Sequence, residues 1–196
     1  MDRREELSEF IKEYCEIRKQ NKRIYLIENT TKIISAFQEK LIILINEQVQ
    51  RQKREITDKI KFIFLCRTLS SNYTGNYEAV LGMSDEMLYL DENRSQIFWY
   101  PELFYKGVEE DLKAAENKIS KKFLHLEDSE LFYIKGLLLN DDWELISDFL
   151  HIISEQSVSL IKSSELLLED ELNFLCGNYK DNLKIIYSTR MEEEHG

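Results

Sequence analysis

The sequence contains few residues that break regular structure, with one Pro and six Gly among 196 residues. Tight turns use Gly for left-handed backbone angles and Pro for a fixed one. A fold with many tight turns, such as an all-β sandwich, therefore fits this chain poorly. Leu, Ile, Glu and Lys are abundant and favour helices. These features predict a largely helical protein.

The aromatic content indicates a substantial hydrophobic core. Ten Tyr, ten Phe and two Trp accompany a hydrophobic share of 43%, which is more than a disordered chain carries. Chain length favours one domain spanning residues 1–196. Within it we expect a helical N-terminal part at 1–69 and a mixed, acidic part at 77–190, joined by a polar loop at 70–76.

The periodicity of the first 69 residues is mainly helical. Leu7, Phe10, Ile11, Tyr14 and Ile17 recur at helical spacing within residues 4–20, which predicts an amphipathic helix with these residues on one face. A second apolar pattern begins near residue 31 and predicts one long helix, or two helices on a shared axis, reaching about residue 69. Residues 59–65 also alternate well enough to form a strand, so both interpretations stay open there.

After residue 76 the pattern changes to short runs rich in Val, Tyr, Ile, Phe and Trp. Runs at 77–83, 87–90 and 96–100 are separated by polar turns, which is typical of a three-stranded antiparallel meander. Segments 171–176 and 183–188 flank a polar stretch and predict a C-terminal hairpin that extends or caps this sheet.

The helical pattern resumes between the two strand regions. Pro101 opens a helix reaching Ile119, since proline is tolerated in a first helical turn. A short extended piece is expected at 123–126, followed by helices at 129–139 and 141–155. The predicted fold class is α+β, predominantly helical, with a small antiparallel sheet at 77–100 and a C-terminal hairpin.

The charge is unevenly distributed along the chain. The total is −11, but residues 1–62 hold 14 Lys/Arg and 11 Asp/Glu, so all the negative excess lies in residues 63–196. Nucleic acids are bound largely through Lys and Arg contacts to phosphates, so we do not expect a nucleic-acid partner. Another protein with a basic surface is the natural complement.

The sequence gives no sign of export or of membrane insertion. The first twelve residues carry charges of both signs, and the most apolar early stretch, residues 41–45, is far shorter than a membrane span. Cys15, Cys66 and Cys176 show no pairing pattern. We therefore expect a cytoplasmic protein with reduced thiols.

The sequence lacks the motifs of common catalytic sites. The three His are not spaced with each other or with Cys as metal ligands would be, and the six Gly are isolated, so no phosphate-binding loop can form. Acidic clusters at 109–111, 141–142 and 169–171 are explained by helix dipoles or a solvated surface. We expect no cofactor, no metal, no catalytic residue and no enzyme of a common class.

The segment 97–105 is the densest aromatic stretch. Alternate strand residues face opposite sides, so one face packs in the core and the other is either covered or a contact surface. Trp and Tyr are frequent anchors of protein interfaces. The predicted interface consists of Phe98, Trp99, Tyr100, Phe104, Tyr105, Glu109, Glu110 and Asp111.

Three functional hypotheses follow. The first is a non-enzymatic protein-binding module, such as an immunity or antitoxin-like protein, an effector chaperone or an adaptor. The second is a carboxylate-dependent enzyme, with Glu78, Asp85, Tyr89 or Asp91 as candidates. The third is a structural or oligomerising subunit, such as a homodimer formed through the helices at 4–20 and 31–69.

Overall fold

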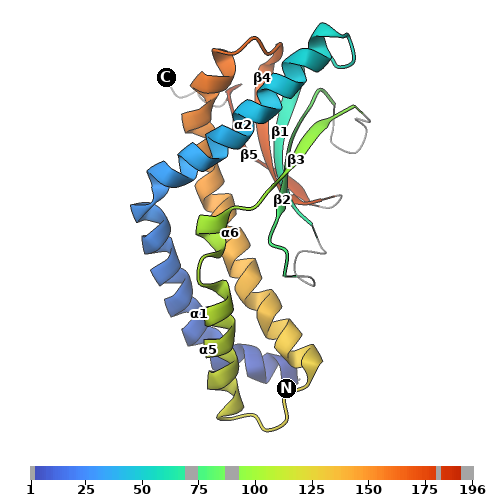
Figure 1. The fold of residues 1–196 in the computed structure, drawn as a ribbon. Helices are drawn as coiled ribbons and strands as arrows, with labels where there is room; N and C mark the ends of the chain where they lie inside the picture. Colours follow the sequence, from blue (N-terminus) through green and yellow to red (C-terminus); the bar gives the residue numbers. More distant parts are fainter. Residues whose placement is uncertain (1–2, 69–74, 87–92, 180–181, 191–196) are drawn as a thin grey trace. The chain divides into compact units, whose positions relative to one another are not determined.

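The computed structural model describes residues 3–68, 75–86, 93–179 and 182–190 (Figure 1). It has the α+β, predominantly helical character that the sequence predicts. The helices are α1 (Arg3–Glu28), α2 (Thr30–Lys53), α4 (Glu102–Tyr105), α5 (Val108–Ser120) and α6 (Asp128–Lys162). The strands are β1 (Ile60–Arg67), β2 (Ala79–Ser84), β3 (Ser95–Trp99), β4 (Leu168–Asn178) and β5 (Leu183–Ser188).

Contacts within the chain group into two compact units. Unit 1 comprises Met1–Thr30 and Glu102–Ile146, and unit 2 comprises Thr31–Pro101 and Ser147–Gly196. The boundaries fall at the end of α1, ahead of α4, and inside α6. Each unit combines segments that are far apart in the sequence.

Unit 2 contains a five-stranded sheet with the order β3-β2-β1-β4-β5. The strand interpretation of residues 59–65 is therefore the correct one, and the predicted helix reaching residue 69 is wrong. Helix α2 ends at Lys53, and Glu55 follows with a left-handed backbone angle (φ 56). Strand β1 lies at the centre of the sheet and is apolar on both faces, which explains why its period is ambiguous in the sequence.

The sheet is mixed, and it differs from the predicted meander. Strands β2 and β3 pair antiparallel, whereas the predicted middle strand at 87–90 lies outside the described residues. Strands β4 and β5 also pair antiparallel, but β4 starts at Leu168 and pairs in parallel with β1. The two C-terminal strands are thus part of the main sheet, in which β4 lies between β1 and the edge strand β5.

Three helix predictions need correction. The helix expected from Pro101 to Ile119 is divided into α4 and α5, because Gly107 adopts a left-handed angle (φ 79) between them. The helices expected at 129–139 and 141–155 form one continuous helix, α6. Residues 123–126 contain bends in place of the extended piece, and His125 has a positive φ of 55.

The two faces of the sheet are distinguished by their neighbours. On one face, Trp99 packs edge-on against Phe37 of α2 with ring centroids 5.6 Å apart, and the Ser95 hydroxyl donates to the Gln48 side chain of the same helix. The opposite face carries a buried cluster that consists of Phe62, Phe64, Cys66, Val80 and Leu175. Both faces of β1 are therefore buried.

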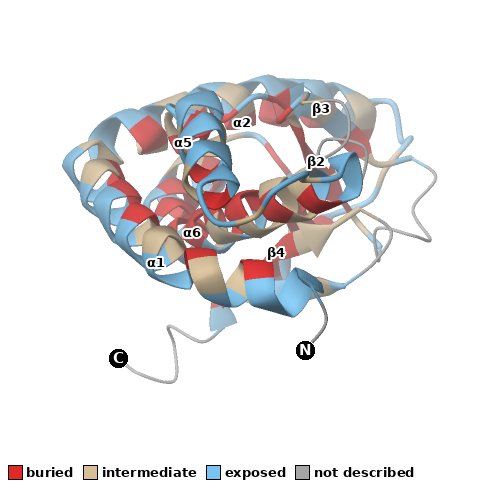
Figure 2. Cartoon of the chain, turned by 90° about the horizontal axis from the view of Figure 1, so that it is seen from below, coloured by how far each residue is buried: buried red, intermediate tan, exposed pale blue. Residues whose placement is uncertain are grey.

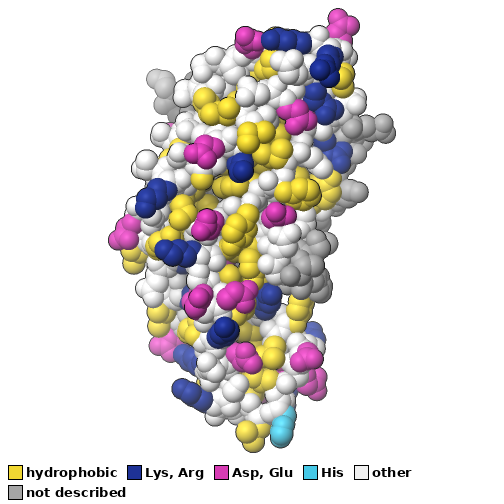
Figure 3. Space-filling view, in the orientation of Figure 1, with side chains coloured by type: hydrophobic (Ala, Val, Ile, Leu, Met, Phe, Trp, Pro, Cys, Tyr) yellow, Lys and Arg dark blue, Asp and Glu magenta, His cyan; other side chains and the backbone are white. Residues whose placement is uncertain are grey.

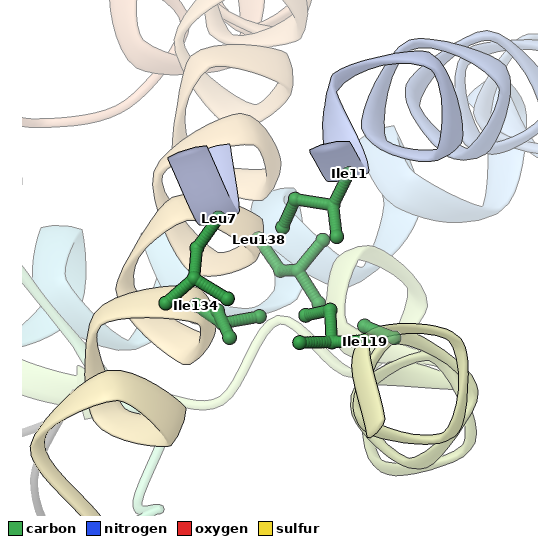
Figure 4. Packing of buried hydrophobic residues seen from close by; sticks show 6 residues of the cluster. Leu7, Ile11, Ile119, Ile134 and Leu138 are labelled. Carbon is green, nitrogen blue, oxygen red and sulfur yellow. The ribbon is translucent and has the colours of Figure 1, made fainter. Parts of the chain in front are cut away.

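Unit 1 is held together by a second core (Figure 4). Three helices contribute to it, α1, α5 and α6, each through an apolar stripe, and Figure 2 shows the alternation of buried and exposed residues along α1 and α5. Its buried members are Leu7, Ile11, Ala115, Ile119, Ile134 and Leu138. Within the residues that the structure describes, no helix has both the length and the apolar composition needed to cross a bilayer.

A matched pair of glycine substitutions tests this packing. A Cβ at Gly82 would lie 2.6 Å from the Ser95 carbonyl oxygen and 2.2 Å from the Phe64 ring, so we expect Gly82→Ala to destabilise unit 2 by about 1–3 kcal/mol. At Gly136 inside α6 no atom lies within 4 Å of the added Cβ. Gly136→Ala should stabilise the protein by about 1 kcal/mol. Denaturant unfolding measures both, and equal effects would contradict the strand register.

The two buried thiols of the sheet predict a loss of stability at high pH. Burial raises the pKa of Cys66 and of Cys176 from 9.0 to about 12. In the unfolded chain each thiol loses its proton near its ordinary value, so the unfolded state binds fewer protons than the folded state above pH 9. The free energy of unfolding should therefore fall as pH rises from 9 towards 12, by at most about 1.4 kcal/mol per pH unit and thiol.

Urea unfolding at a series of pH values measures this effect. The Cys66→Ala/Cys176→Ala variant is less stable at neutral pH, but its stability should depend less on pH above 9. If the free energy of unfolding fell equally steeply with pH in this variant and in the original protein, these thiols would not be buried in the core.

Candidate functional site

The structure assigns the predicted interface residues on β3 to different environments. Phe98 and Tyr100 are 63% and 47% exposed, whereas Trp99 between them is buried against Phe37. This alternation is the one expected of a strand with a single covered face. All three residues belong to unit 2.

The remaining predicted interface residues belong to unit 1. Phe104 and Tyr105 are buried in the short helix α4. Glu109 and Glu110 are exposed in the first turn of α5, and Asp111 is half-buried beside Arg18. The predicted residues are thus divided between two units, although they are close together in the sequence.

Unit 1 contains a buried network of charged side chains that joins its three long helices. The Arg18 guanidinium of α1 donates to Asp111 of α5 at 2.7 Å and to Asp142 of α6 at 2.8 Å. It also donates to the Leu138 carbonyl oxygen at 3.3 Å. The Lys22 ammonium lies 2.9 Å from the other carboxylate oxygen of Asp142, whose side chain is completely buried.

The two cations of this network are compensated unequally. Burial acts to lower the pKa of Arg18, but its hydrogen bond and ion pair with Asp142, together with Asp111, outweigh burial and raise the pKa. Burial also lowers the pKa of Lys22, and here the attraction of Asp142 does not make up for it. Lys22 and Asp142 thus form a buried ion pair.

A cavity of about 280 Å³ lies beside this network. The Tyr14 hydroxyl at its wall donates to the Asp111 carbonyl oxygen at 2.9 Å, and burial together with the Asp111 charge raises the pKa of Tyr14. The cavity is lined by Tyr14, Ile17, Arg18, Asn21, Lys22, Lys106, Gly107 and Asp111. All of these residues belong to unit 1.

Sequence reasoning missed this site and placed Ile17 on the buried face of the first helix. In the structure Ile17 is 55% exposed, and Arg18 and Lys22 occupy the buried stripe of α1 between Ile11 and Leu26. The positions of Arg18 and Lys22 could have revealed their burial, because both continue the helical spacing of the buried residues of α1. The hydrophobic pattern instead assigns Ile17 to the buried face, since apolar residues are ordinarily the buried ones.

Unit 2 has a larger cavity, of about 530 Å³, lined mainly by charged residues. It brings Asp85, an enzyme candidate from the sequence, together with the acidic cluster at 169–171, and Lys61 and Arg190 complete the wall. Asp85 accepts from the Asp58 backbone N–H at 2.8 Å, and Glu171 accepts from the Ser188 hydroxyl at 3.0 Å. These contacts hold two of the four carboxylates in place.

Glu78, another enzyme candidate, is not among the residues that line this cavity. Glu78 accepts a hydrogen bond from Asn76 at 2.9 Å, and Tyr89 and Asp91 lie outside the described residues. Within the described part of the chain, no group of three or more His, Cys, Asp or Glu is placed to hold a metal ion. On the face drawn in Figure 3, Lys/Arg and Asp/Glu side chains are interspersed.

Comparison of the chain with protein-family models, with curated proteins and with solved structures finds no match.

The charge network gives a test of what holds unit 1 together. Asp142→Asn removes the charge that compensates both Arg18 and Lys22, so we expect a loss of about 3–5 kcal/mol in the free energy of unfolding. Glu144→Gln is the matched control, because Glu144 is largely exposed where it pairs with Lys19, and it should cost less than about 1 kcal/mol.

Adding Lys22→Met to Asp142→Asn shows how much of the lost stability comes from the unpaired charge of Lys22. The double variant should recover part of the lost stability, since the substitution removes a buried charge that has no counterion. Chemical denaturation of the four proteins measures this, and a double variant less stable than Asp142→Asn would contradict our account of Lys22.

Proposed function

We propose that this protein is a non-catalytic binding module for another protein, and that the partner presents a basic surface. The observation that carries the proposal is the exposure of Phe98 on the edge strand β3 and of Tyr100 directly after that strand. Immunity proteins, effector chaperones and adaptors are the kinds of protein that fit this description.

The exposed aromatic side chains favour a contact surface. Trp99 packs against Phe37 of α2 and Ser95 hydrogen-bonds to Gln48 of the same helix, whereas Phe98 lies on the opposite side of the strand. Exposed aromatic rings lower the solubility of a free protein, and they bind strongly when a partner removes them from water. Phe98 lies in β3 and Tyr100 follows directly after the end of the strand, so the two exposed rings are close together in the chain.

The charges of unit 2 favour a basic partner. Its residues include 13 Lys/Arg and 19 Asp/Glu, and four carboxylates line its cavity against two cations. A Lys or Arg side chain of a partner would find carboxylate acceptors there. Such pairs mainly raise the association rate and suppress wrong partners.

The same cavity supports a second candidate function, a carboxylate-dependent enzyme. Asp85 and the cluster at 169–171 surround a space large enough for a small substrate. Paired carboxylates act as acid and base when they flank a reacting bond. Substitution of Asp85 and Glu171 by their amides would abolish such an activity, whereas it would only slow the binding of a basic partner, because Phe98 and Tyr100 remain.

Capture from the native cell tests the binding proposal. The tagged protein should retain one stoichiometric basic protein at about 0.15 M salt and less of it at about 1 M salt, where charges are screened. Phe98→Ser/Tyr100→Ser should reduce the capture at least about tenfold, because aromatic anchors contribute about 2 kcal/mol or more each.

Leu124→Ser is the control variant, since Leu124 is 78% exposed in unit 1 and its loss should leave capture unchanged. Equal retention of the partner by the double variant, or no stoichiometric partner at either salt concentration, would count against the proposal. Light scattering of the free protein distinguishes this proposal from the hypothesis of an oligomerising subunit, because such a subunit would form a defined homo-oligomer without any partner.

A further inference from the structure

The sheet of unit 2 has two edge strands, and the edge formed by β5 is protected. The pairing of β5 with β4 shifts register, and β5 carries the exposed Lys184. The carbonyl oxygen of Ile186 lies 2.9 Å from a ring nitrogen of His151 in α6 and accepts a hydrogen bond there. Bulges, lysines and contacts from a neighbouring element are common means by which an edge strand is kept from pairing with another chain.

Strand β3, at the other edge, has none of these protections. Its five residues, SQIFW, are uncharged and include no proline, and five residues is an ordinary strand length. Its pairing with β2 continues from Ser95 to Trp99 without a register shift. Among the residues that the structure describes, β2 is the only strand that pairs with it. A regular, uncharged edge of this kind is one to which a further strand can be added.

The backbone groups at the outer edge of β3 belong to Gln96 and Phe98. The Ser95 carbonyl oxygen points towards β2, because a Cβ at Gly82 of β2 would lie only 2.6 Å from it. Hydrogen-bonded and non-hydrogen-bonded positions alternate along an antiparallel pair, so Ser95 and Ile97 direct their N–H and C=O groups to β2. Gln96 and Phe98 direct theirs away from the sheet.

The same two residues also present exposed side chains. Gln96 and Phe98 lie on one side of β3, opposite the side that Trp99 packs against α2. Phe98 pairs with Val80 of β2, which belongs to the buried apolar cluster on that face of the sheet. A strand added to β3 would therefore extend this apolar face and place its own alternate side chains beside the Phe98 ring.

We propose that β3 binds an extended segment of the basic partner as a further strand of the sheet, with an apolar side chain of that segment covering Phe98. Main-chain hydrogen bonds to Gln96 and Phe98 supply the affinity, and the alternating side chains supply the selection. Unit 2 has 13 Lys/Arg and 19 Asp/Glu, which favours a segment carrying Lys or Arg. The assignment rests on the proposed function and specifies how the partner binds.

A proline substitution at the outer edge tests the added strand. Gln96→Pro removes the N–H that faces the added strand, and proline is tolerated in an edge strand where the N–H faces solvent. The probe is the basic protein that the tagged full chain retains in the capture experiment. Its affinity for Gln96→Pro should fall at least about tenfold. Gln96→Ser is the matched control, because it changes the same side chain but keeps the N–H, and it should leave the affinity unchanged.

The variants separate this proposal from the one on which it rests. Equal affinity of Gln96→Pro and Gln96→Ser, together with lost retention by Phe98→Ser/Tyr100→Ser, would overturn strand addition and leave the binding function standing. Full retention by all three variants, or no retained partner at all, would overturn both proposals. Urea unfolding of the free variants establishes that they are folded.

Amide hydrogen exchange of the full chain, followed by NMR with and without the retained partner, decides the question if Gln96→Pro does not fold. We expect the Gln96 and Phe98 amides to exchange at least about tenfold more slowly in the complex. The Ser95 and Ile97 amides are the internal control, because they are bonded to β2 in both states. Unchanged exchange at Gln96 and Phe98 would overturn the proposal. A homodimer in light scattering that protects the same amides would also overturn it, since a second copy of the chain would then occupy the edge.

Discussion

The completely buried carboxylate of Asp142 is the contact on which unit 1 depends. It accepts from Arg18 through one oxygen and pairs with Lys22 through the other, and Arg18 continues the network to Asp111. These contacts connect α1, α5 and α6 next to their shared apolar core. A buried charge without a partner is strongly unfavourable, so the network permits only an arrangement of these helices in which all its members meet.

Unit 2 depends on a different constraint, the parallel pairing of β1 with β4 at the centre of its sheet. The two strands are separated by about a hundred residues, and their pairing brings the β2–β3 and β4–β5 pairs into one sheet. The cavity wall consequently combines Lys61 and Asp85 with residues from β4.

The two units do not differ in charge as the two parts of the sequence do. Unit 1 holds 13 Lys/Arg and 18 Asp/Glu, so it is almost as acidic as unit 2.

Much of the local structure could be predicted from the sequence, and the candidate sites only in part. Periodicity located α1 and α2, and the Phe98–Trp99–Tyr100 alternation follows directly from strand geometry. The break expected at Asp141–Asp142 was wrong because Arg18 and Lys22 satisfy a carboxylate that otherwise resembles a helix cap. The cavity of unit 1 could not be foreseen, since its wall combines residues about 90 positions apart.

The sequence by itself determined the predominantly helical α+β class, the amphipathic first helix and the alternation on β3, because each depends on residues within one or two helical turns or along one strand. Only the tertiary structure decided that 60–67 is a central strand, that Ile17 is exposed while Arg18 and Lys22 are buried, and that Asp85 meets residues 169–171. These outcomes depend on partners far away in the chain: a buried charge is stable only beside its counterion, and a strand that is apolar on both faces needs packed side chains over each face of its sheet.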